Sequence, residues 1–370
     1  MGKLAAPANG INPSLNSSLN PTLSLPKGEG MCDRHGWMMW IAMVCVLSLF
    51  TSCVDEEEYA DNMTGNFEAL WHIIDERYCF FDYKKEQLGL DWDEVHTRYA
   101  RQVNEGMSTA QFFEVMRNML SELRDGHVNI YTAFDIAREW SWQEDYPSNV
   151  SDTLLRRYLG TDYKMCSGMY YRVLDDNIGY VRYSSFSNDL GSGNLDEVLL
   201  YLAPCRGLII DIRDNGGGMI STAEKLAARF TNEELLVGYM QHKTGPGHND
   251  FSKREEQRLK PAQGIRWQKP VAVLTNRGVF SAANEFVKYM KCCPQAIIVG
   301  DRTGGGAGMP FSSQLPNGWS IRFSACPIYD RQGESTEFGI EPDYQVSLTD
   351  TDFLRGVDTI IEAARRLLSK

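Results

Sequence analysis

The feature that most constrains this fold is an apolar strand that ends in three glycines. The segment GLIIDIRDNGGG (207–218) begins with a continuous apolar run and ends in a glycine turn. The residues that follow, MISTAEKLAARF (219–230), favour a helix. A strand, a glycine turn and a helix in succession are typical of an α/β layer, with the turn at the carboxyl end of the strand. The glycine spacing fits neither the dinucleotide fingerprint nor the phosphate-binding P-loop.

The same order of elements recurs in VAVLTNRGVFSAANEFV (271–287), where Ser281 stands between a strand and a helix. A serine at this place has two possible roles. Its hydroxyl can cap the helix by accepting a backbone N–H bond. Alternatively, it can be a nucleophile, with the helix N-terminus stabilising an oxyanion. The local sequence leaves both roles open.

The rest of the ordered chain divides into a helical part and an α/β part. Apolar residues recur at helical spacing in three early segments: 66–81, 92–106 and 109–123. We therefore expect a small all-α domain at residues 65–122 and an α/β domain at 123–370. Further strands are expected at 178–183, 296–300 and 320–329, and a final helix at 352–368. Residues 241–268 are polar and predict a flexible loop.

The first 52 residues have the pattern of a leader and a secretory signal. An apolar run of about 14 residues at 37–50 follows Arg34, and it is too short to span a bilayer, which takes about 20. The sequence LFTSC that ends this region resembles a bacterial lipobox, which places a lipidated cysteine at Cys53. Residues 53–64 would then form a polar tether. Met31 is an alternative start, and an ordinary signal peptide or uncleaved anchor is the alternative to a lipoprotein.

Charge and cysteine content limit the classes of partner. The formal net charge of −12 disfavours a nucleic-acid partner. The six cysteines that follow Cys53 have no zinc-site spacing, and we expect most of them to be buried free thiols. We predict no metal and no cofactor.

Six segments in one order carry a family resemblance. They are LRDGHV (123–128), IGYVRYSSF (178–186), GLIIDIRDNGGG (207–218), VAVLTNRGVFSAANEF (271–286), VGDRTGGG (299–306) and GIEPD (339–343). Together they resemble the serine peptidases of family S41, which include the C-terminal processing proteases and the tricorn protease core. The resemblance implies a crotonase/ClpP-like α/β superhelix preceded by the small helical domain. The interval between 127 and 178 is too short for the PDZ domain that many of these proteases carry.

The resemblance also implies a catalytic set. In the processing proteases a lysine follows the serine in a segment similar to GDRTGGG, but that position is Gly306 here, so a Ser–Lys pair is not expected. The tricorn-like branch uses serine, histidine and glutamate, and the matching residues are Ser281, His127 and Glu341. In the tricorn protease the link between glutamate and histidine resembles a relay through a serine beside the histidine. That neighbour is Gly126 in this chain, which leaves the route from Glu341 to His127 open.

These residue types fit the chemistry of acyl transfer. Serine needs a base to take its proton, and neutral imidazole can do this at physiological pH. A carboxylate behind the imidazole fixes its tautomer and stabilises the imidazolium. By resemblance, the oxyanion hole would use the backbone N–H groups of Ala282 and Gly217. With an ordinary histidine pKa of about 6.5, activity would decline below that pH.

The sequence thus predicts a serine endopeptidase that acts on peptides or unfolded protein ends through an acyl-enzyme. We expect it in the bacterial cell envelope, bound to the membrane by a lipid at Cys53 and either periplasmic or surface-exposed. The main alternative is a catalytically inactive lipoprotein that binds a peptide or another ligand on the same fold. Acyl-CoA chemistry, suggested by the crotonase analogy, gives no reason for the Ser281, His127 and Glu341 set. The oligomeric state is left open.

Overall fold

The computed structural model describes residues 59–140 and 146–369. The signal segment, Cys53 and the first half of the predicted tether lie outside these residues. No helix in the described ranges is both long and apolar enough to cross a membrane. The described residues belong to one compact unit.

A seven-stranded sheet forms the centre of the α/β part. Its strand order is β13–β10–β9–β6–β5–β4–β3. Strands β5, β6, β9, β10 and β13 run parallel to one another, whereas β4 pairs antiparallel with both β5 and β3. The bounds are β3 Lys164–Cys166, β4 Met169–Val173, β5 Ile178–Tyr183, β6 Gly207–Asp211, β9 Val271–Thr275, β10 Ala296–Gly300 and β13 Tyr344–Gln345. The mixed α/β fold predicted from the glycine turns is therefore confirmed.

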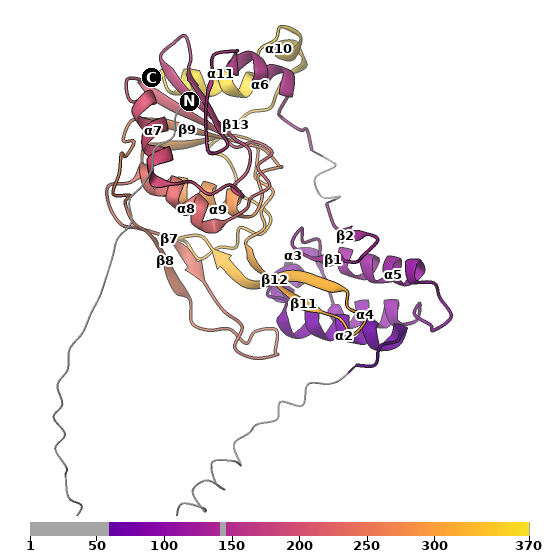
Figure 1. The fold of residues 1–370 in the computed structure, drawn as a ribbon. Helices are drawn as coiled ribbons and strands as arrows, with labels where there is room; N and C mark the ends of the chain where they lie inside the picture. Colours follow the sequence, from indigo (N-terminus) through magenta and orange to yellow (C-terminus); the bar gives the residue numbers. More distant parts are fainter. Residues whose placement is uncertain (1–58, 141–145, 370) are drawn as a thin grey trace, which may run out of the picture. The chain divides into compact units, whose positions relative to one another are not determined.

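Helices cover both faces of this sheet. On one face α8 and α9 lie side by side (Figure 1), and their apolar residues share a core with α7 and the inward side chains of β6 and β9. On the other face α11 closes a smaller core. The bounds are α6 Asp152–Leu159, α7 Ser192–Leu202, α8 Ile220–Ala227, α9 Ala282–Met290, α10 Asp350–Leu354 and α11 Thr359–Leu367, and a short 3₁₀ helix spans Ala228–Phe230.

A second, antiparallel sheet has the strand order β2–β1–β12–β7–β8, and β11 also pairs with β12. The bounds are β1 Asn129–Tyr131, β2 Ile136–Arg138, β7 Leu235–Met240, β8 Glu255–Leu259, β11 Gly308–Gln314 and β12 Ser320–Tyr329. Strand β8 lies within 241–268, so the prediction of a flexible loop there is wrong in part. Its polar side chains misled the prediction, because β8 is largely exposed and its stability comes from backbone pairing with β7.

The early helices share their core with strands of the second sheet. They are α2 Met63–Arg77, α3 Phe81–Leu88, α4 Trp92–Ala100 and α5 Thr109–Ser121. Their apolar faces share one core with Ile130 of β1, Leu315 after β11, and Ile321 and Phe323 of β12, and Figure 1 shows β11 and β12 among these helices. The core of these helices therefore extends beyond the predicted boundary after residue 122, and the division into domains stays a prediction. Helical spacing identified the helices, but it could not show that strands about 200 residues later complete their core.

A buried ion network fixes the chain that leads into the glycine turn after β6. The Arg213 side chain is fully buried and contacts Asp211 Oδ2 at 2.6 Å and Asp358 Oδ2 at 3.0 Å. It also donates to the backbone carbonyl of Asn149 at 3.0 Å. Asp358 in turn caps α11 by accepting the backbone N–H groups of Ile360 and Ile361. The network thus ties the approach to the glycine turn to the C-terminal helix.

We expect Asp358→Ala to lower the free energy of unfolding by about 3–5 kcal/mol, because it leaves the buried Arg213 and Arg182 with the single carboxylate of Asp211 and removes the N-cap of α11. Urea unfolding followed by circular dichroism measures the effect. Asp189→Ala is the control, since it removes the exposed partner of Lys225 and should leave the midpoint nearly unchanged. Equal midpoints for the two variants would contradict the role assigned to the network.

Candidate active site

Ser281 has a strained backbone and does not cap α9. Its φ of 57° and ψ of −124° lie in a region that residues other than glycine rarely adopt. Its N–H donates to the carbonyl of Gly305 at 2.8 Å, which helps to hold this conformation. Its hydroxyl makes no capping bond to the helix. Of the two roles that the sequence left open, the capping role is therefore not the one observed.

The Ser281 hydroxyl instead contacts His127. The distance from His127 Nε2 to Ser281 Oγ is 2.9 Å across 154 residues of sequence. His127 precedes β1 and is buried, and its backbone N–H donates to Asp125 Oδ1 at 2.7 Å. The structure therefore brings together the nucleophile and the base that the motifs suggested, at a distance suited to proton transfer.

The side chain next to the other ring nitrogen of His127, Nδ1, is Ser324 of β12. Ser324 Oγ lies 3.5 Å from His127 Nδ1 and donates to Asp125 Oδ2 at 2.8 Å. Tyr78 donates its hydroxyl to the same carboxylate oxygen at 3.1 Å. These contacts connect His127 to the buried Asp125 carboxylate through the Ser324 hydroxyl, which can orient the ring and stabilise its charged form.

The structure does not bring Glu341 to the histidine. The Glu341 side chain is 66% exposed and lies 3.4 Å from Arg302 Nε. The buried glutamate is Glu337, which contacts Lys84 Nζ at 3.0 Å and accepts the N–H of Ala307 at 2.9 Å. The turn at Gly339 accounts for the difference. Its φ is +100° and its α-carbon lies against the Thr303 carbonyl, so the chain reverses and one glutamate faces the interior while the other faces solvent.

Burial shifts two pKa values at the site in opposite directions. It lowers the pKa of His127 to about 4, with Arg322 and Lys84 adding to the decrease and Asp125 opposing it. It raises the pKa of Glu337 to about 7, with Asp125 adding to the increase and Lys84 opposing it. His127 is therefore a neutral base well below pH 6.5, which corrects the expectation based on an ordinary histidine.

Phe280 occupies the space that the family's other catalytic groups would need. A Cβ at Gly126 would lie 2.9 Å from the Phe280 ring, and a Cβ at Gly306 would lie 2.5 Å from it. The ring also packs against the imidazole of His127, with centroids 4.8 Å apart. A serine beside His127 or a lysine at residue 306 would therefore displace Phe280. This contact explains both departures from the family pattern.

The predicted oxyanion hole is present in part. The Gly217 α-carbon lies against the Phe280 carbonyl and the backbone nitrogen of Ala282, the first residue of α9. A Cβ at Gly217 would lie 2.8 Å from Ser281 Cβ, so this position needs glycine. However, the Gly217 N–H donates to Asn215 Oδ1 at 3.0 Å. It can therefore serve an oxyanion only if that bond opens or is shared.

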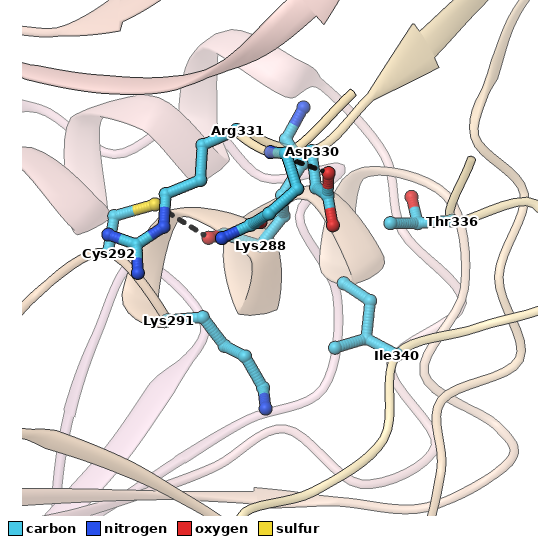
Figure 2. A pocket seen from close by; sticks show the side chains of 8 residues that line it. Lys288, Lys291, Cys292, Asp330, Arg331, Thr336 and Ile340 are labelled. Carbon is cyan, nitrogen blue, oxygen red and sulfur yellow. Dashed lines mark hydrogen bonds between the residues drawn. The ribbon is translucent and has the colours of Figure 1, made fainter. Parts of the chain in front are cut away.

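The reacting pair opens into a cavity of about 390 Å³. Its walls come from both sheets and the glycine turn: Gly126, His127, Asn129, Tyr131, Arg138, Trp140, Ser187, Gly216, Gly218, Phe280, Ser281 and Arg322. A smaller hollow of about 110 Å³ lies near the C-terminal end of α9 and includes Lys288, Lys291 and Arg331 (Figure 2). Its lysines already pair with Glu285 and Asp343, and Ser281 is not among its lining residues. No group of three or more potential metal ligands occurs in the described ranges.

Sequence reasoning missed three site residues, namely Asp125, Ser324 and Glu337. Asp125 stands two residues before His127 in the quoted DGH segment, so its position was a usable signal. Glu337 lies four residues before the glutamate chosen by motif matching. Ser324 lies in an apolar strand and carries no local signal, since only the pairing of β12 with β1 brings it to the histidine.

Comparisons with known proteins identify the family of this chain. The family model described as "Peptidase family S41" matches residues 177–346, and the "Tricorn protease C1 domain" model matches 59–121. A crystal structure of a protein from Parabacteroides merdae, described as a candidate peptidase, is 50% identical, with 84% of this chain and 97% of that chain covered and a TM-score of 0.79. The chain belongs to peptidase family S41.

More distant S41 relatives agree with this assignment. Mature CPAF complexed with lactacystin has a TM-score of 0.63 at 14% identity, covering 83% of this chain and 97% of that chain, which shows the fold alone. The carboxy-terminal processing protease CtpA of Bacillus subtilis is 24% identical over 49% of this chain and 38% of its own length. The chloroplastic C-terminal processing peptidase of Tetradesmus obliquus is 27% identical over 51% and 40%. This S41 chain thus spans about two fifths of the length of these two curated relatives.

We expect kcat/KM to stay nearly constant from pH 7 to pH 5 and to fall below that with a midpoint near 4, because His127 must be neutral to act as base. Burying neutral His127 stabilises the fold fully above about pH 6.5, and this contribution is lost as the pH falls towards 4. Circular dichroism at each pH therefore shows whether the chain is still folded where the rate falls. Arg322→Gln removes a cation that lowers this pKa and should move the midpoint upward. A wild-type midpoint at 6.5 would contradict the burial argument.

Asp125→Asn should lower kcat on the order of 100-fold, since it removes the charge that supports the imidazolium through Ser324. Glu341→Gln is the matched control and should change kcat less than twofold, because that side chain is exposed. Steady-state kinetics on one peptide, with thermal unfolding of both variants, makes the comparison. A larger loss in Glu341→Gln than in Asp125→Asn would restore Glu341 to the catalytic set.

Proposed function

We propose that this chain is a serine peptidase that hydrolyses peptides or unfolded protein ends through an acyl-enzyme. The observation that carries the proposal is the 2.9 Å contact between the strained Ser281 hydroxyl and the buried His127 ring. The hydroxyl of a structural serine at a helix start would accept a bond from the helix backbone, and the Ser281 hydroxyl does not.

In the proposed reaction, His127 Nε2 takes the hydroxyl proton as Ser281 Oγ attacks the scissile carbonyl. The imidazolium is supported through Ser324 and Asp125. The new oxyanion is stabilised by the N–H of Ala282 at the start of α9, where the helix dipole adds positive potential. His127 then gives its proton to the leaving amine, and water releases the acyl group by the same steps in reverse.

The proposal extends to fold type and location. A crotonase/ClpP-like superhelix is supported by the strand–turn–helix units at β6–α8 and β9–α9. Lipid attachment at Cys53 and a place in the bacterial cell envelope are supported by the signal-like sequence at residues 37–53 alone. Endopeptidase action and the trimming of C-terminal ends both fit the site, and an inactive peptide-binding protein on the same fold is the competing function.

Ser281→Ala should abolish hydrolysis of an unstructured peptide and leave the fold intact. A fluorophosphonate probe should label the wild-type chain, because its serine is activated, and should not label the variant. Ser192→Ala changes an exposed serine at the start of α7 and should behave like the wild type in both assays.

An inactive binding protein would show no labelling of Ser281 and no turnover. Undiminished turnover by Ser281→Ala would instead place the nucleophile elsewhere. Circular dichroism of the variant separates loss of chemistry from loss of fold.

A further inference from the structure

We propose that a second cavity, separate from the one that contains the reacting pair, binds a small zwitterion such as a free amino acid or a dipeptide. Its volume is about 310 Å³, and its walls come from α6, from β4 and the turn that follows it, and from the chain between α10 and α11. None of its lining residues belongs to the cavity of Ser281 and His127. The site is therefore additional to the proposed peptidase reaction and does not depend on it.

The size and lining of this cavity suit a small ligand with an apolar part. Small-molecule sites in proteins typically occupy about 300–1,000 Å³, so this cavity stands at the lower limit of that range. The apolar side chains of Leu174 and Val357 share the wall with charged groups. Such a wall can hold an apolar side chain while the charged groups fix the charged ends of the ligand.

Arg157 of α6 supplies an uncommitted positive charge. Within residues 59–140 and 146–369, its guanidinium makes no ion pair and no hydrogen bond. The guanidinium lies against the α-carbon of Gly356, where a Cβ would collide with it. Gly356 has a φ of +72°, a conformation that favours glycine. The backbone between α10 and α11 thus leaves room for this arginine at the wall of the cavity.

Arg172 of β4 can bind the same anion as Arg157. Its Nε and Nη1 donate to the carbonyls of Val173 and Leu159 at 3.3 and 3.0 Å, which hold the guanidinium in place. Its ionic partner in the described ranges is Asp162 at 3.2 Å, and that pair is weak because the Asp162 side chain is 73% exposed. A carboxylate matches the planar donor geometry of the two guanidinium groups.

Asp175 supplies the opposite charge. It lies in the turn after β4, it is exposed, and no described residue forms an ion pair or a hydrogen bond with its side chain. The other carboxylate of the wall, Glu362, already accepts bonds from the Tyr158 hydroxyl and from Arg365, each at 2.7 Å. Asp175 is therefore the carboxylate that remains for a cation of the ligand.

A ligand that carries both charges satisfies all of these free groups. A simple anion would leave Asp175 unpaired, and a simple cation would leave the arginines unpaired. Asp175 follows Arg172 by three residues, so their α-carbons are at most about 11 Å apart. An extended dipeptide spans about 7 Å, and an amino acid spans less, so both termini of either ligand fit within this interval.

The wall between the charged groups is preorganised. The Tyr158 hydroxyl donates to Glu362 and accepts the backbone N–H of Asp358 at 3.2 Å. The Asp358 carboxylate in turn contacts the buried Arg213. The cavity is thus tied to the ion network that fixes the chain before the glycine turn, and a ligand that binds here stabilises that arrangement.

The test is a calorimetric titration of the full chain carrying Ser281→Ala, so that a peptide probe is not cleaved. The probes are leucine, glycyl-leucine, N-acetyl-leucine, which lacks the ammonium group, and leucinamide, which lacks the carboxylate. We expect leucine or glycyl-leucine to bind at least about tenfold more tightly than either blocked compound, because each block removes a charge-assisted contact. The preferred one of the two shows whether the site takes an amino acid or a dipeptide.

Variants assign the binding to this cavity. Arg157→Gln should remove most of the preference over leucinamide, and Asp175→Asn should remove most of the preference over N-acetyl-leucine. Both side chains are exposed, so the fold should be retained, and circular dichroism checks this. Arg322→Gln makes the same change in the catalytic cavity and is the matched control, which should keep the full affinity.

The inference is overturned if neither leucine nor glycyl-leucine binds saturably, or if the blocked compounds bind equally well. A loss of affinity in Arg322→Gln without a loss in Arg157→Gln would place the ligand in the catalytic cavity and would also overturn it. Labelling of Ser281 by a fluorophosphonate in the wild-type chain is independent of these outcomes, so failure of the proposed function is a separate result.

Discussion

The contact between Ser281 and His127 joins two parts of the chain that have separate hydrophobic cores. Ser281 stands next to Ala282, which belongs to the core between α8, α9 and the parallel sheet. His127 stands next to Val128, which belongs to the core shared by the early helices and β12. The site therefore exists only when both cores are formed and correctly placed. Strand β12 links them, since it pairs with β1 beside His127 and with β7 beside the parallel sheet.

Buried charged residues near the histidine also help to hold the site together. Lys84 of α3 lies between the Glu337 carboxylate and the Arg124 carbonyl, and both of its contacts are within 3.1 Å. Asp125 is held by Ser324 and Tyr78. Since unpaired buried charges are costly, these pairs help to fix the relative positions of the early helices and β12. The same burial lowers the pKa of His127 and keeps the base neutral.

The charge around the cavity is uneven. The carboxylates lie behind His127, where they are paired or hydrogen-bonded, while Arg138 and Arg322 face the cavity without anionic partners in the described ranges. The Phe280 ring lies against Gly126 and Gly306, the positions where the family resemblance would place a serine and a lysine. A side chain at either glycine would therefore require the Phe280 ring to move.

The sequence by itself determined the parallel α/β layer, the early helices and the reacting pair, because apolar runs, glycine turns and short motifs are local signals. It did not determine the carboxylate behind the histidine. Motif matching chose Glu341, whereas the turn at Gly339 buries Glu337 and exposes Glu341. The sequence also did not predict that Ser324 contacts His127 or that Arg138 and Arg322 lie on either side of Asn129. These neighbours arise from strand pairing, and β12 is far from β1 in sequence. The pKa of His127 likewise depends on tertiary structure, because burial and neighbouring charges come from several distant segments.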